Sequence, residues 1–361
     1  MKLHKISLLS LFFSLSLISC QSLGNTPEVA IDAPTFFAVA KKAAVKTASS
    51  SSFGYELNAD QIGFSLNLAA QGEKPFLFQN QKTEINWSNV LLQWATTGFG
   101  EGDTTRKASA VLSAKMAYSS VLQNDTTSES IGNNGTLDLN LGAYWEDQEL
   151  YLYANHKFDD SFFSPYGNGN ISTDTGPIYE KVSHPDDFPA AFYDTHDYES
   201  WFEEWEEKFE TFSSSSFDSR YDGLTSAFTF CQQGEEYQMN FEVTNETKDA
   251  FFVSLGNLLA NENVSETNSV DWKSLSKATD FRSFRFQLAL NQEGFVSFSF
   301  DIDVTASSPK PFPYIVNDNM SIYVSPSVAL KAQGKAKFGY GVTPKDKPEG
   351  EYAKVMSPSL L

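Results

Sequence analysis

Two clusters of histidine and aspartate are the residues of this chain that could do metal chemistry. The stretches 184–187 (His-Pro-Asp-Asp) and 194–197 (Asp-Thr-His-Asp) place imidazole and carboxylate groups close together, a donor set that suits a divalent cation. Neither has the spacing of an H-E-x-x-H helix or of an EF-hand loop. With 46 acidic residues in the chain, such neighbours arise by chance. We therefore expect no metal site and no cofactor.

Catalytic signatures with a fixed spacing are absent from the sequence. It contains no Gly-x-Ser-x-Gly elbow, no Gly-x-x-x-x-Gly-Lys-Ser/Thr loop and no Gly-x-Gly-x-x-Gly after a predicted strand. A hydrolase with two carboxylates needs no adjacent residues, but no pair in this sequence stands out. We predict a protein that is not an enzyme.

The first residues read as a secretory signal that ends at a cysteine. Lys2 and Lys5 precede an apolar run, 6–18, which serines interrupt and which is too short to span a bilayer well. The motif Leu17-Ile18-Ser19-Cys20 resembles a bacterial lipobox. In such proteins the signal is removed before the cysteine, which then takes up acyl chains such as palmitate. The alternative is an ordinary secretory signal with a cysteine near its end.

The lipobox resemblance implies a lipoprotein of the cell envelope, held on the extracytoplasmic face of the membrane by acyl chains on Cys20. Residues 1–19 would be the signal peptide and 20–34 a flexible tether. Cys231, the other cysteine, would then have no disulfide partner, and its place in an alternating run predicts a small buried residue of a strand.

Composition narrows the class of partner. The net charge is −20, and removal of residues 1–19, with Lys2 and Lys5, makes it −22. A surface with this much negative charge repels nucleic acid and anionic lipid headgroups. We therefore expect no nucleic-acid partner. Hydrophobic residues make up 41% of the chain and aromatic residues 14%, with 31 Phe and 15 Tyr, which favours β structure.

Alternating apolar residues predict a mainly β chain with a few helices. Three pairs of alternating runs surround short polar turns at 146–148, 232–235 and 291–294, which is typical of antiparallel hairpins. Helical spacing predicts a helix from Thr35, as its N-cap, to about residue 47, and another over 247–260. We expect a short turn at 271–275 and a flexible tail over 343–361.

Residues 159–220 interrupt the alternation, and we expect a loop-and-helix insertion there. Its second half carries aromatic residues, Trp201 and Trp205 among them, at helical spacing between glutamates. Three interpretations stay open: an amphipathic helix that covers the mouth of the sheet, a lid whose tryptophans touch a lipid, or an exposed aromatic surface that binds a glycan or a protein.

Two hairpin sequences, AYWEDQELYLYA (143–154) and LALNQEGFVSFSFDIDVT (288–305), resemble those of the LolA/LppX-like lipoprotein superfamily. The resemblance implies an α+β, mainly β body over 35–342: a strongly curved antiparallel sheet, an incomplete barrel, with helices on its concave side. A hydrophobic or lipid ligand would lie between sheet and helices. Within the late hairpin, the alternation suggests that four residues line this space: Phe284, Phe286, Phe298 and Phe300. Trp201 and Trp205 would also touch the ligand. The rival function is a cell-surface scaffold that binds a glycan or protein through 159–220.

Overall fold

Runs of alternating apolar and polar residues form the strands, as the sequence predicts. The structure, a computed structural model, describes residues 28–48, 52–72, 80–98, 106–124, 127–146, 149–182, 203–204, 206–207, 219–261, 271–308, 310–317, 320–339 and 342–355. Its strands are β1 (Glu28–Ala30), β2 (Phe53–Gly72), β3 (Asn80–Thr97), β4 (Lys107–Gln123), β5 (Ser130–Glu146), β6 (Glu149–Ser164), β7 (Gly167–Asp174), β8 (Ile178–Val182), β9 (Phe228–Gln233), β10 (Glu236–Glu242), β11 (Thr279–Asn291), β12 (Gly294–Ser307), β13 (Phe312–Asn317), β14 (Met320–Phe338) and β15 (Ala353–Val355).

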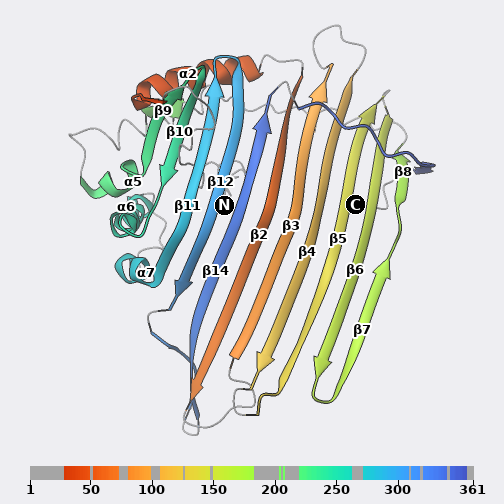
Figure 1. Cartoon of the computed structure of the whole chain (residues 1–361), viewed down its shortest axis with the longest axis vertical. Helices are drawn as coiled ribbons and strands as arrows, with labels where there is room; N and C mark the ends of the chain where they lie inside the picture. Colours follow the sequence, from red (N-terminus) through yellow and green to blue (C-terminus); the bar gives the residue numbers. More distant parts are fainter. Residues whose placement is uncertain are drawn as a thin grey trace.

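These strands of the described residues join a single 15-stranded sheet (Figure 1). Its order is β1-β9-β10-β11-β12-β14-β2-β3-β4-β5-β6-β8-β15, and in addition β13 pairs with β14 and β7 with β6. The sheet does not close, because β1 and β15 stand at its two ends. It is mixed, since β15 runs parallel to β8 while the other pairs are antiparallel. The prediction of a mainly β chain is confirmed.

The three predicted hairpins are confirmed as β5–β6, β9–β10 and β11–β12. Local chemistry fixes two of their turns. Gly234 has a φ of +63°, a left-handed conformation that glycine adopts without strain. In the β11–β12 turn, the Asn291 side chain accepts hydrogen bonds from the backbone N–H groups of Glu293 and Gly294, at 2.9 and 3.1 Å.

The helices are α2 (Ala33–Ala48), the short α5 (Asp222–Thr225), α6 (Lys248–Asn261) and α7 (Trp272–Ala278). α2 starts before Thr35 because Asp32 caps it, accepting the Thr35 N–H at 2.9 Å. The expected turn at 271–275 is part of α7, whose first turn is capped by Asp271. Among the described helices, none combines the length and the apolar character that a bilayer span requires.

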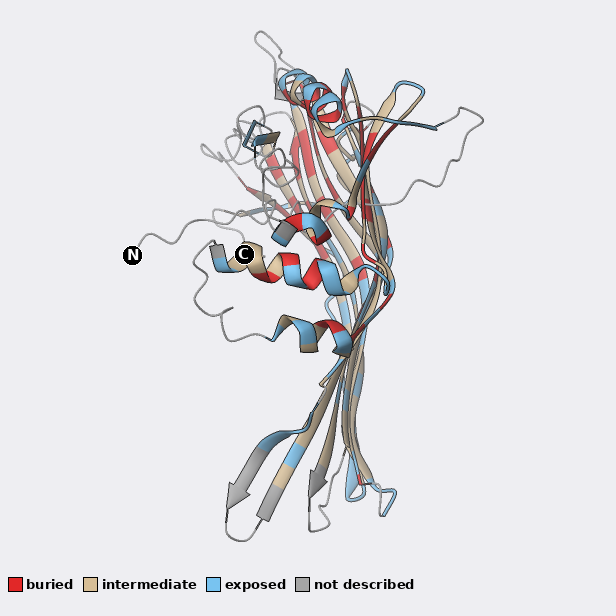
Figure 2. Ribbon diagram, turned by 90° about the vertical axis from the view of Figure 1, so that its left-hand side faces the viewer, coloured by how far each residue is buried: buried red, intermediate tan, exposed pale blue. Residues whose placement is uncertain are grey.

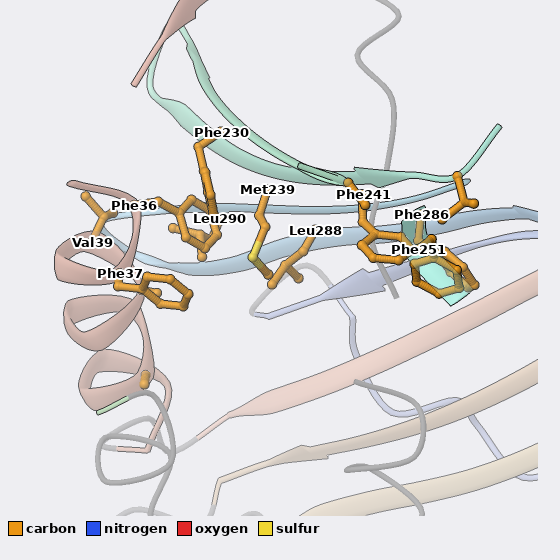
Figure 3. Close-up of a cluster of buried hydrophobic side chains, with 14 of the residues drawn as sticks. Phe36, Phe37, Val39, Phe230, Met239, Phe241, Phe251, Phe286, Leu288 and Leu290 are labelled. Atoms are coloured by element: carbon orange, nitrogen blue, oxygen red, sulfur yellow. The ribbon is translucent and has the colours of Figure 1, made fainter. Parts of the chain in front are cut away.

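The main hydrophobic core lies where α2, α6 and α7 pack on the β9–β12 end of the sheet (Figure 3). The rings of Phe36 and Phe37 on α2 lie 5.4 and 6.0 Å from that of Phe230 on β9, and Phe251 on α6 lies 5.6 Å from Phe241 on β10. The helices all stand on the same side of the sheet (Figure 2). They therefore cover one face of it, at one end.

Residues 342–355 cross the opposite face, in contrast to the expected flexible tail (Figure 1). The backbone N–H of Lys345 donates to Ser109 Oγ at 2.9 Å, and the Lys347 ammonium donates to Glu146 at 2.7 Å. β15 then adds to the edge of β8. Contacts with strands far away in the sequence hold this segment, so its local composition gives no sign of them.

Residues 159–182 differ from the expected insertion, because they complete β6 and form β7 and β8. All eight residues of β7 are exposed. Backbone pairing with β6, rather than burial of alternate side chains, forms this strand, and a hydrophobic pattern cannot detect such a strand. In the same way, residues 28–30 of the expected tether form β1 by pairing with β9.

We expect Phe286→Ala to lower the free energy of unfolding by about 3–5 kcal/mol, because it opens a cavity in the main core. Phe286 is only 4% exposed. Urea unfolding followed by circular dichroism measures the change. Phe312→Ala is the matched control: its side chain is 57% exposed, and we expect a loss within about 0.5 kcal/mol. Equal losses in the two variants would contradict the location of this core.

Candidate ligand-binding face

The helix face of the sheet, which we define as the face on which α2, α6 and α7 pack, is apolar far beyond the helices. Residues that are partners on neighbouring strands project to the same face. The strand pairing therefore traces a row across eight strands, from β11 to β6, in which every residue is apolar: Phe284, Ile302, Ala332, Ile62, Trp87, Met116, Leu137 and Phe158.

The next row on the helix face begins apolar and ends polar. From β12 to β7 it contains Val304, Leu330, Phe64, Ile85, Tyr118, Gly135, Asp160 and Ile171. On β12, β14, β2 and β3, the side chains of this row are aliphatic or aromatic and carry no polar atoms. Polarity enters on β4 and β6, through the phenol of Tyr118 and the carboxylate of Asp160.

The opposite face, which we call the polar face, carries ion pairs between neighbouring strands. Lys115 on β4 lies 3.0 Å from Asp138 on β5, and Lys331 on β14 lies 3.8 Å from Asp303 on β12. Surface pairs of this kind contribute little to stability but keep a face solvated. The long strands are thus amphipathic, with chemically different faces.

The central part of the helix face is only partly covered. The helices cover the β9–β12 end, and a second buried cluster that includes Trp145 and Leu150 occupies part of β5 and β6. Between them, Phe64 and Leu330 are each 40% exposed and Leu141 is 36% exposed. Buried residues gather in the upper half of the sheet, and the lower halves of the long strands are mostly intermediate or exposed (Figure 2). We call the helix-face residues of β14 and β2–β5 that lie outside these two buried clusters the open apolar face.

The four phenylalanines predicted to line a ligand site lie at the covered end of this face. Phe286 belongs to the main core (Figure 3). Its ring lies 5.3 Å from Phe284 and 6.4 Å from Phe298, which in turn lies 6.0 Å from Phe300. Phe298 and Phe300 stand on β12, beside β14, where the open apolar face begins. Contact of these four residues with a ligand stays a prediction.

Two glycines let aromatic rings lie close against the sheet. A Cβ at Gly334 would come within 2.6 Å of the Phe300 ring, and a Cβ at Gly135 within 2.7 Å of the Tyr118 ring and hydroxyl. Both distances are shorter than carbon atoms tolerate. Glycine at these positions therefore allows Phe300 to lean over β14 and Tyr118 to lean over β5.

Tyr118 reaches across β5 to Asp160 on β6. Its hydroxyl donates to Asp160 Oδ1 at 2.6 Å, and its ring stacks on Phe158 with centroids 6.4 Å apart. Burial of the phenol, followed by the hydrogen bond to Asp160 and the charge of that carboxylate, raises the pKa of Tyr118 to about 12. The phenol therefore stays protonated and keeps donating at any physiological pH.

Several other residues singled out by the sequence lie outside the described residues. These are Cys20, Trp201, Trp205 and the His–Asp clusters of 184–187 and 194–197. Next to the tryptophans, Glu206 is described, and its carboxylate lies 2.5 Å from the ammonium of Lys41 on α2. Within the described part of the chain, no three side chains of the metal-binding types gather around a common point.

The residues that make up the open apolar face and its polar end are not apparent from the sequence. Phe64 and Leu330 belong to recognised alternating runs, but alternation alone does not tell which part of a face remains uncovered. Asp160 was assigned to an insertion. Phe158 and Phe162, two residues to either side of it, continue the alternation of β6, and that signal could have placed Asp160 on the helix face.

Comparison with known proteins gives no match: no family model fits this chain, and no curated protein resembles its sequence at a significant level. The assignment of a function therefore depends on the chemistry of the chain itself. The feature that most needs an explanation is the open apolar face.

We expect Asp160→Asn to lower the pKa of Tyr118, because two of the three effects that raise it come from the Asp160 carboxylate. The ultraviolet absorbance of phenolate, recorded as a difference from Tyr118→Phe, isolates this group among the 15 tyrosines. Asp159→Asn removes the same charge from the polar face and is the control, with no expected change. A Tyr118 titration that is the same in Asp160→Asn would contradict the described contact.

The same group makes stability depend on alkaline pH. An unfolded chain loses the Tyr118 proton near pH 10, whereas the folded chain keeps it to about 12. Between these values the folded state binds more protons, so the free energy of unfolding should fall as the pH rises from 10 to 12. Tyr118→Phe should make that fall shallower in urea unfolding measured across this range.

Proposed function

We propose that this chain binds a hydrophobic ligand, of the lipid class, on the open apolar face, and that it does so as a membrane-anchored lipoprotein of the cell envelope without catalysis. The observation that supports the proposal is the row of apolar residues that continues from the helix-covered core to exposed Phe64 and Leu330. Contiguous apolar surface beyond a few hundred Å² on a protein usually marks a place of interaction.

The energetics favour a ligand with a long hydrocarbon chain. Each methylene removed from water contributes about 0.8 kcal/mol, and the apolar protein surface that it covers contributes about 25 cal/mol per Å². A sheet face offers no enclosed polar groups, since its backbone groups are paired within the sheet. Away from its polar end at Tyr118 and Asp160, the open apolar face would therefore select by hydrocarbon content and shape rather than by hydrogen bonds.

The finer fold assignment belongs to the same proposal. In a LolA/LppX-like architecture, the helices and the ligand share the concave face of a curved, incomplete barrel. The position of α2, α6 and α7 on the apolar face, and not on the polar face, is in accord with this architecture. The sheet of this chain would then be such a barrel wall, with the four core phenylalanines at the helix-covered border of the ligand.

The proposed anchor would hold the body near the membrane. Seven residues separate Cys20 from Glu28, where β1 begins. An extended chain over these eight steps spans at most about 28 Å. Because β1 pairs with β9 and leads directly into α2, lipidation of Cys20 would keep the helix-covered end of the sheet within that distance of the acyl chains.

Native mass spectrometry tests the ligand directly. The full chain carrying Cys20→Ser, which has no thiol at that position to acylate, is purified without detergent and then extracted into organic solvent. The proposal expects a stoichiometric bound lipid, or uptake of a neutral probe such as pyrene-labelled diacylglycerol. A chain that carries no lipid and takes up no probe would overturn the proposal.

We expect Phe64→Asp to weaken binding of the pyrene-labelled diacylglycerol by about tenfold or more, because a ligand would have to cover a carboxylate. Probe fluorescence in a titration measures the change. Ser65→Asp is the control, because it places the same charge on the next residue, which faces the polar side of the sheet. The affinity should stay within about twofold of the parent chain, since a ligand on the open apolar face does not contact residue 65. Equal weakening by both variants would argue for a non-specific effect of charge.

We expect the full chain, expressed in a bacterium that processes lipoproteins, to enter the detergent phase on phase partition, and Cys20→Ser to move to the aqueous phase. Two or three acyl chains give a stable anchor, whereas a protein without them has none. Mass spectrometry of the N-terminal peptide identifies the acyl groups. If both forms partition alike, the lipobox interpretation is wrong.

The rival function, a scaffold that binds a glycan or protein through 159–220, has one observation in its favour. β7 is fully exposed and offers the backbone groups of its outer edge to a partner strand. A purified chain that refuses lipid would shift the proposal to this surface.

A further inference from the structure

The lower part of the helix face, away from the helices, is almost free of charge. The strand pairing assigns its positions to β14, β2, β3, β4, β5 and β6. They are Ile322, Val324, Pro326, Val328, Leu330, Ala332, Ile62, Phe64, Leu66, Leu68, Ala70, Gln81, Thr83, Ile85, Trp87, Met116, Tyr118, Ser120, Leu122, Ile131, Asn133, Gly135, Leu137, Phe158, Asp160 and Phe162. Asp160 is the single carboxylate among these described positions.

Asp160 stands among apolar neighbours. Phe158 and Phe162 flank it on the same face of β6, and Ile171 is its partner on β7. Tyr118 donates one hydrogen bond to Oδ1. An ionised carboxylate accepts at about four lone-pair sites, so this group can accept further hydrogen bonds.

A ligand that covers this part of the face must compensate for the desolvation of the Asp160 carboxylate. Covering an ionised group with hydrocarbon is unfavourable unless the ligand supplies a donor or an opposite charge. A second anion beside Asp160 would be repelled, and the Tyr118 hydroxyl is already engaged in donating. An ammonium group would satisfy the free acceptor sites and the charge together.

We infer that Asp160, with Tyr118, forms a headgroup subsite that selects amphiphiles with an amine head over those with an anionic head. This inference rests on the proposed function, since the hydrocarbon chain of the amphiphile would lie on the open apolar face. Asp160 touches the ammonium group, and Tyr118 holds the carboxylate in place across Gly135.

The dimensions of the sheet fit such a ligand. From Asp160 on β6 the apolar rows lead across β5, β4, β3 and β2 to β14. Five inter-strand spacings of about 4.8 Å give a length of about 24 Å. One leaflet of a bilayer is about 15 Å of hydrocarbon, so a chain of membrane-lipid length fits across the strands with its head at Asp160.

The test compares three single-chain amphiphiles that differ only in the head: hexadecylamine, hexadecanol and palmitate. Each displaces pyrene-labelled diacylglycerol from the full chain carrying Cys20→Ser, below its own micellar concentration. We expect the order amine, alcohol, carboxylate, with about threefold to tenfold between amine and alcohol, the range of a charge-assisted hydrogen bond at a partly exposed site. Asp160→Asn should remove the difference in affinity between hexadecylamine and hexadecanol. It should also reduce the difference in affinity between these two amphiphiles and palmitate.

A matched control separates the subsite from the general attraction of a cation to a chain of net charge −20. Asp159→Asn removes the same charge from the adjacent residue, which faces the polar side, where Ser172 and Lys157 contact it. It should keep the full preference for the amine. Tyr118→Phe, which preserves the ring, should reduce the preference by a smaller factor than Asp160→Asn.

The outcomes distinguish the inference from the proposed function. If all three amphiphiles displace the probe equally, or if Asp159→Asn and Asp160→Asn lower the preference alike, the headgroup subsite is wrong while binding on the apolar face stands. If neither the probe nor any amphiphile binds, the proposed function itself fails. Circular dichroism spectra that match the parent chain confirm that each variant is folded.

Discussion

The alternation of apolar and polar residues along strands of sixteen to twenty residues is the constraint on which the rest of this structure depends. Since successive side chains of a strand point to opposite faces, a regular alternation in neighbouring strands sorts the whole sheet into an apolar and a polar face. Such a sheet gains its stability only where the apolar face is covered. The core lies where helices cover the apolar face, and the candidate site lies where the helices no longer cover it.

The described helices cover the apolar face at one end of the sheet only. α2, α6 and α7 bring a dense set of aromatic rings to β9–β12, and this part has the character of an ordinary core. Beyond β12 the same face continues through β14 and β2 without a described helix over it. The transition between the two parts occurs at Phe298 and Phe300, where Gly334 gives the Phe300 ring room on β14.

Polar side chains have different roles on the two faces of the sheet. On the polar face, the segment 342–355 is fixed by hydrogen bonds to Ser109 and Glu146 and by the pairing of β15 with β8. Such contacts tie the long central strands together on the side where no helix of the described residues packs. On the lower part of the helix face, Asp160 is the single carboxylate among the described positions, and its contact with Tyr118 brings a charged group to a largely apolar surface.

The sequence by itself determined the mainly β character, the three hairpins and two of the helices, because period, turn residues and helical spacing are local properties of the chain. It did not reveal β7, which forms by backbone pairing without burying alternate side chains. Nor did it reveal β15 and the packed segment 342–355, whose partners are more than a hundred residues away. Nor could alternation tell core from exposed surface: Phe286 and Phe64 occupy equivalent places in alternating strands, yet one lies under helices and the other does not. Only the order of the strands in the sheet decides which apolar residues α2 and α6 reach, and so which remain open to a ligand.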